Sequence, residues 1–176
     1  MGWEQERENL SLWREILESV VLAVVLAAII RIWLFEPFYI PSPSMQPTLY
    51  PHDRIIVNKA AYRFHSPKRG DIVVFKFPLD PSRALIKRII ALEGETIEVK
   101  EGYVYINGRR LEEPYIVHEL TPNYGPYRVP KGYYFVMGDN RNNSEDSRMW
   151  GPLAKKYIIG KAVLIYWPPE RMGLLK

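Results

Sequence analysis

The sequence has no cysteine and only three histidines, which narrows the chemistry that its 176 residues can support. The lack of cysteine excludes disulfides, thiolate metal ligands and a cysteine nucleophile. The histidines, His52, His65 and His118, lie apart in loop-like stretches, and no HExxH spacing occurs. We therefore expect no metal site and no cofactor.

A strong net charge is also missing. The chain has 24 lysines and arginines against 20 aspartates and glutamates, which leaves a formal charge of +4. The two signs are interleaved along most of the chain, so no basic surface for nucleic acid is expected. The length suits one compact domain with an appendage.

One long apolar run is present, SVVLAVVLAAIIRIWLF, which covers residues 19–35 and carries a single charge, Arg31. A helix needs about 17–25 apolar residues to cross a bilayer. A buried core helix would show a polar stripe and a cleaved signal peptide would end in small residues, and this run does neither. We predict a transmembrane helix over residues 19–35, between an N-terminal segment of residues 1–18 and a β-rich domain of residues 36–176. Charge alone leaves its orientation open.

After this run the pattern changes from helical to strand-like. Short stretches rich in β-branched and aromatic residues are bounded by proline, glycine and aspartate, which is typical of strands. The pairs Glu101-Gly102 and Asn107-Gly108 mark tight hairpin turns. The proline-rich stretch of residues 112–131 is expected to be a loop. The strands are expected at residues 54–59, 71–77, 85–92, 96–100, 103–106, 132–139 and 157–167. This pattern predicts a mainly antiparallel β domain.

Two serines stand among three prolines in PSPSMQPTL, residues 41–49, close behind the apolar run. A serine nucleophile needs a base, and neither a GxSxG nor an SxxK motif is present. Lys87, in ALIKRII, is flanked by apolar residues, and burial would lower its pKa enough for it to act as a base. A lysine in a strand is usually solvated, so the pattern alone leaves both interpretations open.

A third stretch, MGDNRNNSEDSRMWG at residues 137–151, places glycine, aspartate, asparagine and serine directly after an apolar strand. Such a loop is often a turn held by its own side chains, and it is also where a rigid scaffold presents functional groups. Asp146 and Arg148 stand two apart and form either a structural brace or two separate surface charges.

Taken together, these stretches resemble the bacterial type I signal peptidase family. The resemblance lies in the order of the apolar helix, FEPFYIPSPSMQPTL, RGDIVVFKFP, LIKRIIALEGE and MGDNRNNSEDSRMWG, and it extends over residues 20–162. It implies a membrane-bound serine endopeptidase that removes signal peptides from exported preproteins, cleaving after Ala-x-Ala-like sites through an acyl-enzyme. Five blocks in the same order are a specific match.

The resemblance also implies roles for individual residues. Ser44 matches the family nucleophile, and Lys87 matches its general base. The Ser42 hydroxyl and the Ser44 backbone N–H match the oxyanion hole. Ser144 matches the serine that orients the lysine.

Further residues are implied to support the site or to bind substrate. Asp146 and Arg148 match an acidic and a basic residue beside the dyad. By position, the residues expected to line shallow apolar substrate pockets are Phe38, Ile40, Met45, Leu49, Val74, Leu85 and Ile86. An extended substrate would lie against strand edges such as residues 84–87.

The family further implies a place in the cell and a set of partners. Its members have a cytoplasmic N-terminus and a catalytic domain on the outer face of the cytoplasmic membrane. The expected partners are signal peptides, the lipid bilayer and nearby secretion machinery, with no nucleic acid. The sequence departs from the family pattern at Pro43, Leu85 and Asn142, of which the first two would alter the shape of the pocket.

Two other functions are compatible with the same residues. One is a related Ser-Lys peptidase of the self-cleaving repressor type, although the apolar anchor and the missing DNA-binding region disfavour it. The other is an inactive membrane-tethered homologue that only binds peptides. Acylation of Ser44 by an inhibitor would separate an enzyme from such a binding module.

Overall fold

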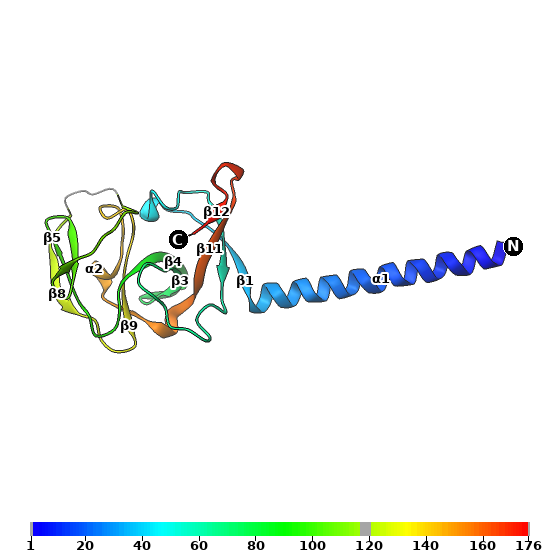
Figure 1. Cartoon of the computed structure of the whole chain (residues 1–176), viewed down its shortest axis with the longest axis horizontal. Helices are drawn as coiled ribbons and strands as arrows, with labels where there is room; N and C mark the ends of the chain where they lie inside the picture. Colours follow the sequence, from blue (N-terminus) through cyan, green and yellow to red (C-terminus); the bar gives the residue numbers. More distant parts are fainter. Residues whose placement is uncertain (1, 117–120, 176) are drawn as a thin grey trace.

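The protein consists of a long N-terminal helix and a body of β-strands, seen in a computed structural model (Figure 1). The structure describes residues 2–116 and 121–175, and within the first helix it describes the side chains of residues 13–28, 31 and 33. Every strand pair in the described part of the chain is antiparallel. The predicted mainly antiparallel β domain is therefore confirmed.

The larger of two sheets has eight strands and carries most of the body. In spatial order they are β1 (Phe35–Tyr39), β2 (Arg54–Asn58), β11 (Ile158–Trp167), β3 (Ile72–Phe77), β4 (Asp80–Ala91), β9 (Tyr133–Met137) and β10 (Leu153–Ala154), with β12 (Gly173–Leu174) beside β11.

The smaller sheet has four strands and lies at the end of the body opposite the first helix (Figure 1). Its order is β7 (Arg109–Arg110), β6 (Tyr103–Ile106), β5 (Thr96–Lys100) and β8 (Tyr124–Arg128). The two predicted hairpin turns are confirmed, because Glu101, Gly102, Asn107 and Gly108 all have the positive φ angles that such turns require.

The helices are one long and several short elements. They are α1 (Gly2–Trp33), α2 (Ser147–Trp150), and the 3₁₀ turns η1 (Pro43–Met45), η2 (Lys155–Tyr157) and η3 (Pro169–Arg171).

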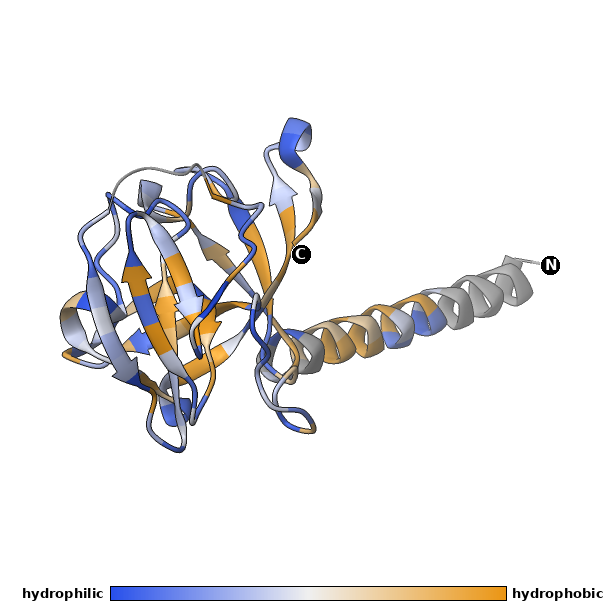
Figure 2. Cartoon of the chain, turned by 60° about the vertical axis from the view of Figure 1, so that its left-hand side comes forward, coloured by the Kyte–Doolittle hydropathy of each residue, from blue (hydrophilic) through white to orange (hydrophobic). Residues whose placement is uncertain are grey.

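Strand β3 is buried on both faces and connects two hydrophobic clusters. Alternate side chains of a strand point to opposite sides, so Ile72 and Val74 join the cluster shared with β1, β2 and β11. Val73 and Phe75 join the cluster shared with β4, β9 and β10. Figure 2 shows the apolar residues concentrated along the strands inside the body. β3 therefore gives its neighbour β4 a rigid support.

Helix α1 projects away from the β-body and joins it at β1 (Figure 1). Its apolar side chains lie in the open, and Val20, Leu22 and Val24 are each more than half exposed. Within the described residues, no helix combines the length and the apolarity needed to cross a membrane.

Two predicted boundaries are wrong. The predicted helix end at Phe35 is two residues too late, because α1 ends at Trp33 and Phe35 already pairs with β2 in strand β1. The predicted loop over residues 112–131 contains β8. There Tyr124 and Tyr127 both pack on Phe135, and this tertiary contact outweighs the local preference of glycine and proline for turns.

We expect the substitution Phe75→Ala to lower the free energy of unfolding by about 3–5 kcal/mol, because it removes a fully buried ring that contacts Trp150. Urea unfolding of the full chain, followed by circular dichroism, measures this loss. The matched control is Phe64→Ala, since Phe64 is 87% exposed and should change stability by about 0.5 kcal/mol at most. Equal losses in the two variants would contradict the described core.

Candidate active site

A proline-rich loop between β1 and β2 presents Ser44. Pro43 occupies the first turn of η1, where its fixed φ suits a helical start and its missing N–H is not needed. The 138–148 loop contacts this turn, since the Asn140 backbone N–H donates to the Ser44 carbonyl at 3.1 Å and the Asn140 side chain donates to the Pro43 carbonyl at 3.2 Å. Ser44 is only 7% exposed. Its hydroxyl is thus held in a defined place with little access for water.

Lys87 on β4 faces this hydroxyl. Its Nζ lies 2.7 Å from Ser44 Oγ, and the lysine is only 3% exposed. Burial lowers the pKa of Lys87 from 10.5 to about 8, although the charges of Asp146, Glu145 and Asp139 act in the opposite direction. At pH 8 about half of the amine is therefore uncharged, and in that form it can accept a proton from Ser44.

Ser42 lies on the same side as Ser44. The two hydroxyl oxygens are 3.3 Å apart, and Ser42 has extended backbone that leads into η1. A hydroxyl in this position can donate to charge that develops next to Ser44. The structure thus brings together three of the residues that the sequence singled out, Ser42, Ser44 and Lys87.

Ser144 differs from expectation. Its buried hydroxyl has no hydrogen-bond partner among the residues that the structure describes, so the expected bond to Lys87 is not formed. The Ser144 side chain packs against Gly138, where an added Cβ would overlap both this side chain and the Ser44 carbonyl oxygen. Position 138 must therefore be glycine for the two loops to approach each other so closely.

Asp146 and Arg148 form the structural brace. The guanidinium of Arg148 donates to both oxygens of the fully buried Asp146 carboxylate, at 2.8 Å each. Asp146 also accepts the Gly138 backbone N–H at 3.1 Å, and Arg148 donates to the Arg141 carbonyl at 2.7 Å. The pair closes the 138–148 loop on itself, which fixes the segment beside Ser44.

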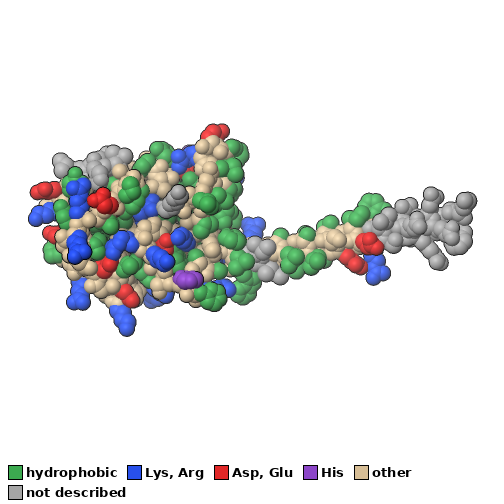
Figure 3. Space-filling model, viewed as in Figure 1, with side chains coloured by type: hydrophobic (Ala, Val, Ile, Leu, Met, Phe, Trp, Pro, Cys, Tyr) green, Lys and Arg blue, Asp and Glu red, His purple; other side chains and the backbone are tan. Residues whose placement is uncertain are grey.

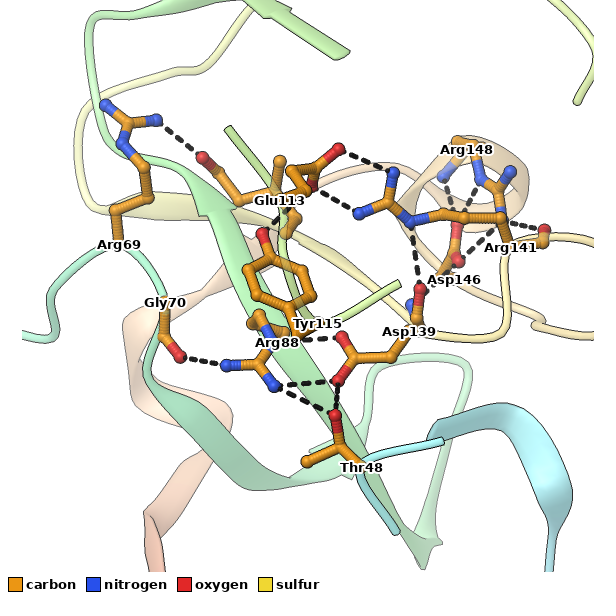
Figure 4. A network of polar contacts seen from close by, with 12 residues as sticks. Thr48, Arg69, Gly70, Arg88, Glu113, Tyr115, Asp139, Arg141, Asp146 and Arg148 are labelled. Atoms are coloured by element: carbon orange, nitrogen blue, oxygen red, sulfur yellow. Dashed lines mark hydrogen bonds and ion pairs between the residues drawn. The ribbon is translucent and has the colours of Figure 1, made fainter. Parts of the chain in front are cut away.

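A second ion pair joins Arg88 on β4 to Asp139 (Figure 4). Arg88 donates to both oxygens of Asp139, at 2.9 and 2.7 Å, and to the Gly70 carbonyl at 2.9 Å. The Thr48 hydroxyl donates to Asp139 at 2.5 Å. The loop that carries Ser44, strand β4 and the 138–148 loop are therefore joined at one carboxylate.

Figure 4 also shows a third pair, Arg141 with Glu113, next to Tyr115. Arg141 donates through two nitrogens to the Glu113 carboxylate, and through Nε to the Gly138 carbonyl at 3.1 Å. The Tyr115 hydroxyl donates to Glu113 at 2.9 Å, and its ring lies 3.9 Å from the Arg88 guanidinium. The sequence pattern did not predict this network. The sequence did contain one signal of buried ion pairs, which is a charged residue placed among apolar ones, as Arg88 is in β4.

A cleft of about 410 Å³ opens over the two serines and the lysine. One wall is the part of β4 before Arg88, which pairs with β3 on one side, whereas the described pairing with β9 begins only at Arg88. The edge of β4 is thus unpaired along the cleft. The lining residues are Pro41, Ser42, Pro43, Ser44, Arg83, Ala84, Leu85, Lys87, Asn143 and Glu145.

Only one of the predicted pocket residues, Leu85, lines this cleft. The others belong to one hydrophobic cluster, in which Ile40, Met45, Leu49, Val74 and Ile86 are buried and Phe38 is partly buried. Their apolar side chains form the core between β3 and the loop that carries Ser44. They therefore support the position of that loop and do not line the cleft.

The histidines lie elsewhere. His52 is exposed and contacts the Tyr39 hydroxyl at 2.5 Å, and His65 is exposed. His118 lies outside the described residues. Neither described histidine lines the cleft that holds Ser44.

Comparison with known proteins gives a consistent result. The model of the family described as signal peptidase, peptidase S26, matches residues 13–167. A probable signal peptidase I-2 of Synechocystis sp. is 46% identical, over 93% of this chain and 77% of the relative. The signal peptidase I of Leptolyngbya laminosa is 48% identical, over 90% of this chain and 82% of the relative.

A solved structure is also similar. The crystal structure of a signal peptidase I from Enterococcus faecalis is 34% identical in sequence, with a TM-score of 0.50. The similarity covers 55% of this chain and 96% of that one. About half of this chain thus shares the fold of that signal peptidase I structure.

We expect Glu113→Gln to lower the free energy of unfolding by about 3–5 kcal/mol, because it leaves the buried guanidinium of Arg141 without its counter-charge. Chemical denaturation measures the change. The matched control is Glu36→Gln, whose partner Lys59 lies 3.3 Å away in a partly exposed pair, which should change stability by about 1 kcal/mol at most. Comparable effects of the two substitutions would refute the importance of the buried pair.

Proposed function

Because the chain belongs to the signal peptidase family, peptidase S26, we propose that Ser44 and Lys87 form the dyad with which it cleaves its substrates. The protein is a serine peptidase that removes N-terminal signal peptides from exported preproteins. The observation that carries the proposed dyad is the contact of 2.7 Å between the buried Lys87 amine and the Ser44 hydroxyl.

The first half of the reaction forms an acyl-enzyme. Neutral Lys87 accepts the Ser44 proton while Ser44 Oγ attacks the scissile carbonyl carbon. The carbonyl oxygen becomes an oxyanion that the Ser44 N–H and the Ser42 hydroxyl stabilise. Lys87, now an ammonium, gives its proton to the departing amine, and the mature protein leaves while the signal peptide stays esterified to Ser44.

The second half regenerates the enzyme. Lys87 is neutral again and accepts a proton from a water molecule, which attacks the ester carbon. The same two donors stabilise the second oxyanion. Lys87 then returns the proton to Ser44 Oγ, and the signal peptide is released with a free carboxylate.

Three further residues support this chemistry. We assign the orientation of Lys87 to Ser144, whose buried hydroxyl has no hydrogen-bond partner among the described residues and lies, like the Ser44 carbonyl, against Gly138. Asp146 and Arg148 hold that loop in place through their bidentate pair. These are positioning roles, since none of the three residues accepts or donates the reacting proton.

The substrate lies extended along the unpaired edge of β4, around residues 84–87, and adds a strand to it. Small side chains before the scissile bond fit shallow pockets walled by Leu85. Behind that wall is the cluster already described, which contains Phe38, Ile40, Met45, Leu49, Val74 and Ile86. An Ala-x-Ala-like site satisfies this geometry.

We also propose that the apolar part of α1, which the sequence predicts over residues 19–35 and which ends at Trp33 in the structure, anchors the enzyme in the cytoplasmic membrane, with residues 1–18 in the cytoplasm and the β-body on the outer face. The exposed apolar side chains of α1 support this. So does the end of the body next to α1, where hydrophobic side chains gather (Figure 3). Phe35, Tyr39 and Trp167 are exposed there, on β1 and β11. This placement also puts the enzyme beside the bilayer and the secretion machinery.

Substitution of the dyad tests the mechanism. We expect Ser44→Ala and Lys87→Ala each to lower kcat by about 10⁴-fold or more on a preprotein with an Ala-x-Ala site, because either change removes the whole proton-transfer unit. The control, His65→Ala, changes an exposed residue outside the cleft and should retain activity. Substantial cleavage by either dyad variant in a folded state would overturn the assignment. A pure binding module would also leave Ser44 unlabelled by an acylating inhibitor.

The pH profile follows from the lowered pKa of Lys87, which is about 8. Since the neutral amine is the active form, kcat/KM should rise with pH, by about tenfold from pH 7 to pH 9, and then level off. Initial rates at low substrate concentration across this range measure it. A rate that keeps climbing about tenfold per pH unit beyond pH 9 would indicate an ordinary, solvated lysine.

A further inference from the structure

The cleft contains two charged side chains of opposite sign outside the proposed dyad. Arg83 stands on the β4 wall and Glu145 on the wall made by the 138–148 loop. Both are exposed, and neither forms an ion pair among the described residues. The neighbouring Asp146 differs in this respect, since both of its carboxylate oxygens accept hydrogen bonds from Arg148.

Glu145 lines the same cleft as Ser44 and Lys87. Its charge raises the pKa of Lys87 against the larger effect of burial, so its field reaches the base. Arg83 is four residues before Lys87 on the same strand, which is about 13 Å at the rise of an extended chain. The two charges therefore face different parts of a bound peptide.

The chemistry of the proposed dyad decides which substrate residue comes near Glu145. Lys87 must deliver a proton to the departing amine, so the first residue of the mature chain has its nitrogen beside Lys87 at the moment of cleavage. The residue before the scissile bond occupies a small apolar pocket and offers no room for a charge. The first residue of the mature protein is therefore the one that enters the part of the cleft near Lys87, a cleft that Glu145 also lines.

We propose that Glu145 selects preproteins by charge, favouring lysine or arginine as the first residue of the mature chain and disfavouring aspartate or glutamate. This inference rests on the proposed dyad and adds a specificity determinant to it. An exposed carboxylate contributes a small interaction energy. Its attraction for a basic side chain together with its repulsion of an acidic one corresponds to a kcat/KM ratio of about 2- to 10-fold between the two substrates.

The test uses three preproteins that differ only in the first mature residue, which is lysine, serine or aspartate. The full-length enzyme in detergent is assayed above the pKa of Lys87, about 8, where the base itself is largely uncharged. For the wild type we expect kcat/KM to decrease from the lysine to the aspartate substrate. For Glu145→Gln the lysine-to-aspartate ratio should fall to about one.

Two controls separate this field effect from other causes. Glu101→Gln removes the same charge from an exposed hairpin in the smaller sheet and should keep the wild-type ratio. Salt at about 1 M shortens the screening length to about 3 Å, so it should reduce the wild-type ratio. A steric preference would not respond to salt.

The outcomes are distinct. A wild-type ratio near one, or a ratio that survives Glu145→Gln, overturns the charge selection and leaves the dyad intact. Failure of the wild type to cleave even the serine substrate overturns the proposed dyad and with it the selection. A ratio that is lost in Glu145→Gln and retained in Glu101→Gln establishes Glu145 as the determinant.

Discussion

The dehydration of Lys87 is the constraint on which the rest of the site depends. A buried ammonium is costly, and that cost is what lowers the pKa of the lysine to about 8. Nearby carboxylates favour the charged ammonium form of Lys87, yet Asp139 and Asp146 are both needed to hold the loops in place. Each of them is paired with an arginine, Arg88 or Arg148, and burial outweighs the effect of their charge on the pKa of the lysine.

These pairs belong to a group of buried charges around the site. The ion pairs Arg88–Asp139, Arg141–Glu113 and Arg148–Asp146 converge on the 138–148 loop (Figure 4). Buried pairs contribute little net stability relative to apolar packing, but they have directional hydrogen bonds that an apolar core lacks. Their contribution here is to set the position of Ser44 relative to Lys87. Gly138 completes the arrangement, because the absence of a side chain lets the loop lie directly against Ser44.

Much of this could be predicted from the sequence because it is local. The alternation of apolar residues predicts the strands, the Asn-Gly and Glu-Gly pairs predict the hairpin turns, and the order of the blocks predicts the family. Two of the three ion pairs could not be predicted in the same way. Arg88 and Asp139 are separated by 51 residues and Glu113 and Arg141 by 28, so only the folded sheet brings them together. Strand β8 was missed for a related reason, since its stability comes from aromatic packing on Phe135 and its own composition favours a turn.

The unpaired edge of β4 has a consequence for how the enzyme evolves. On the proposed binding mode, that edge offers main-chain N–H and C=O groups to the substrate, and every residue except proline carries the same two groups. Most substitutions at residues 84–87 therefore leave these contacts in place. Signal peptides can therefore vary in sequence as long as they bind in an extended conformation and have small side chains next to the scissile bond. A peptide-like inhibitor that binds the same edge would be correspondingly hard to escape by single mutations there.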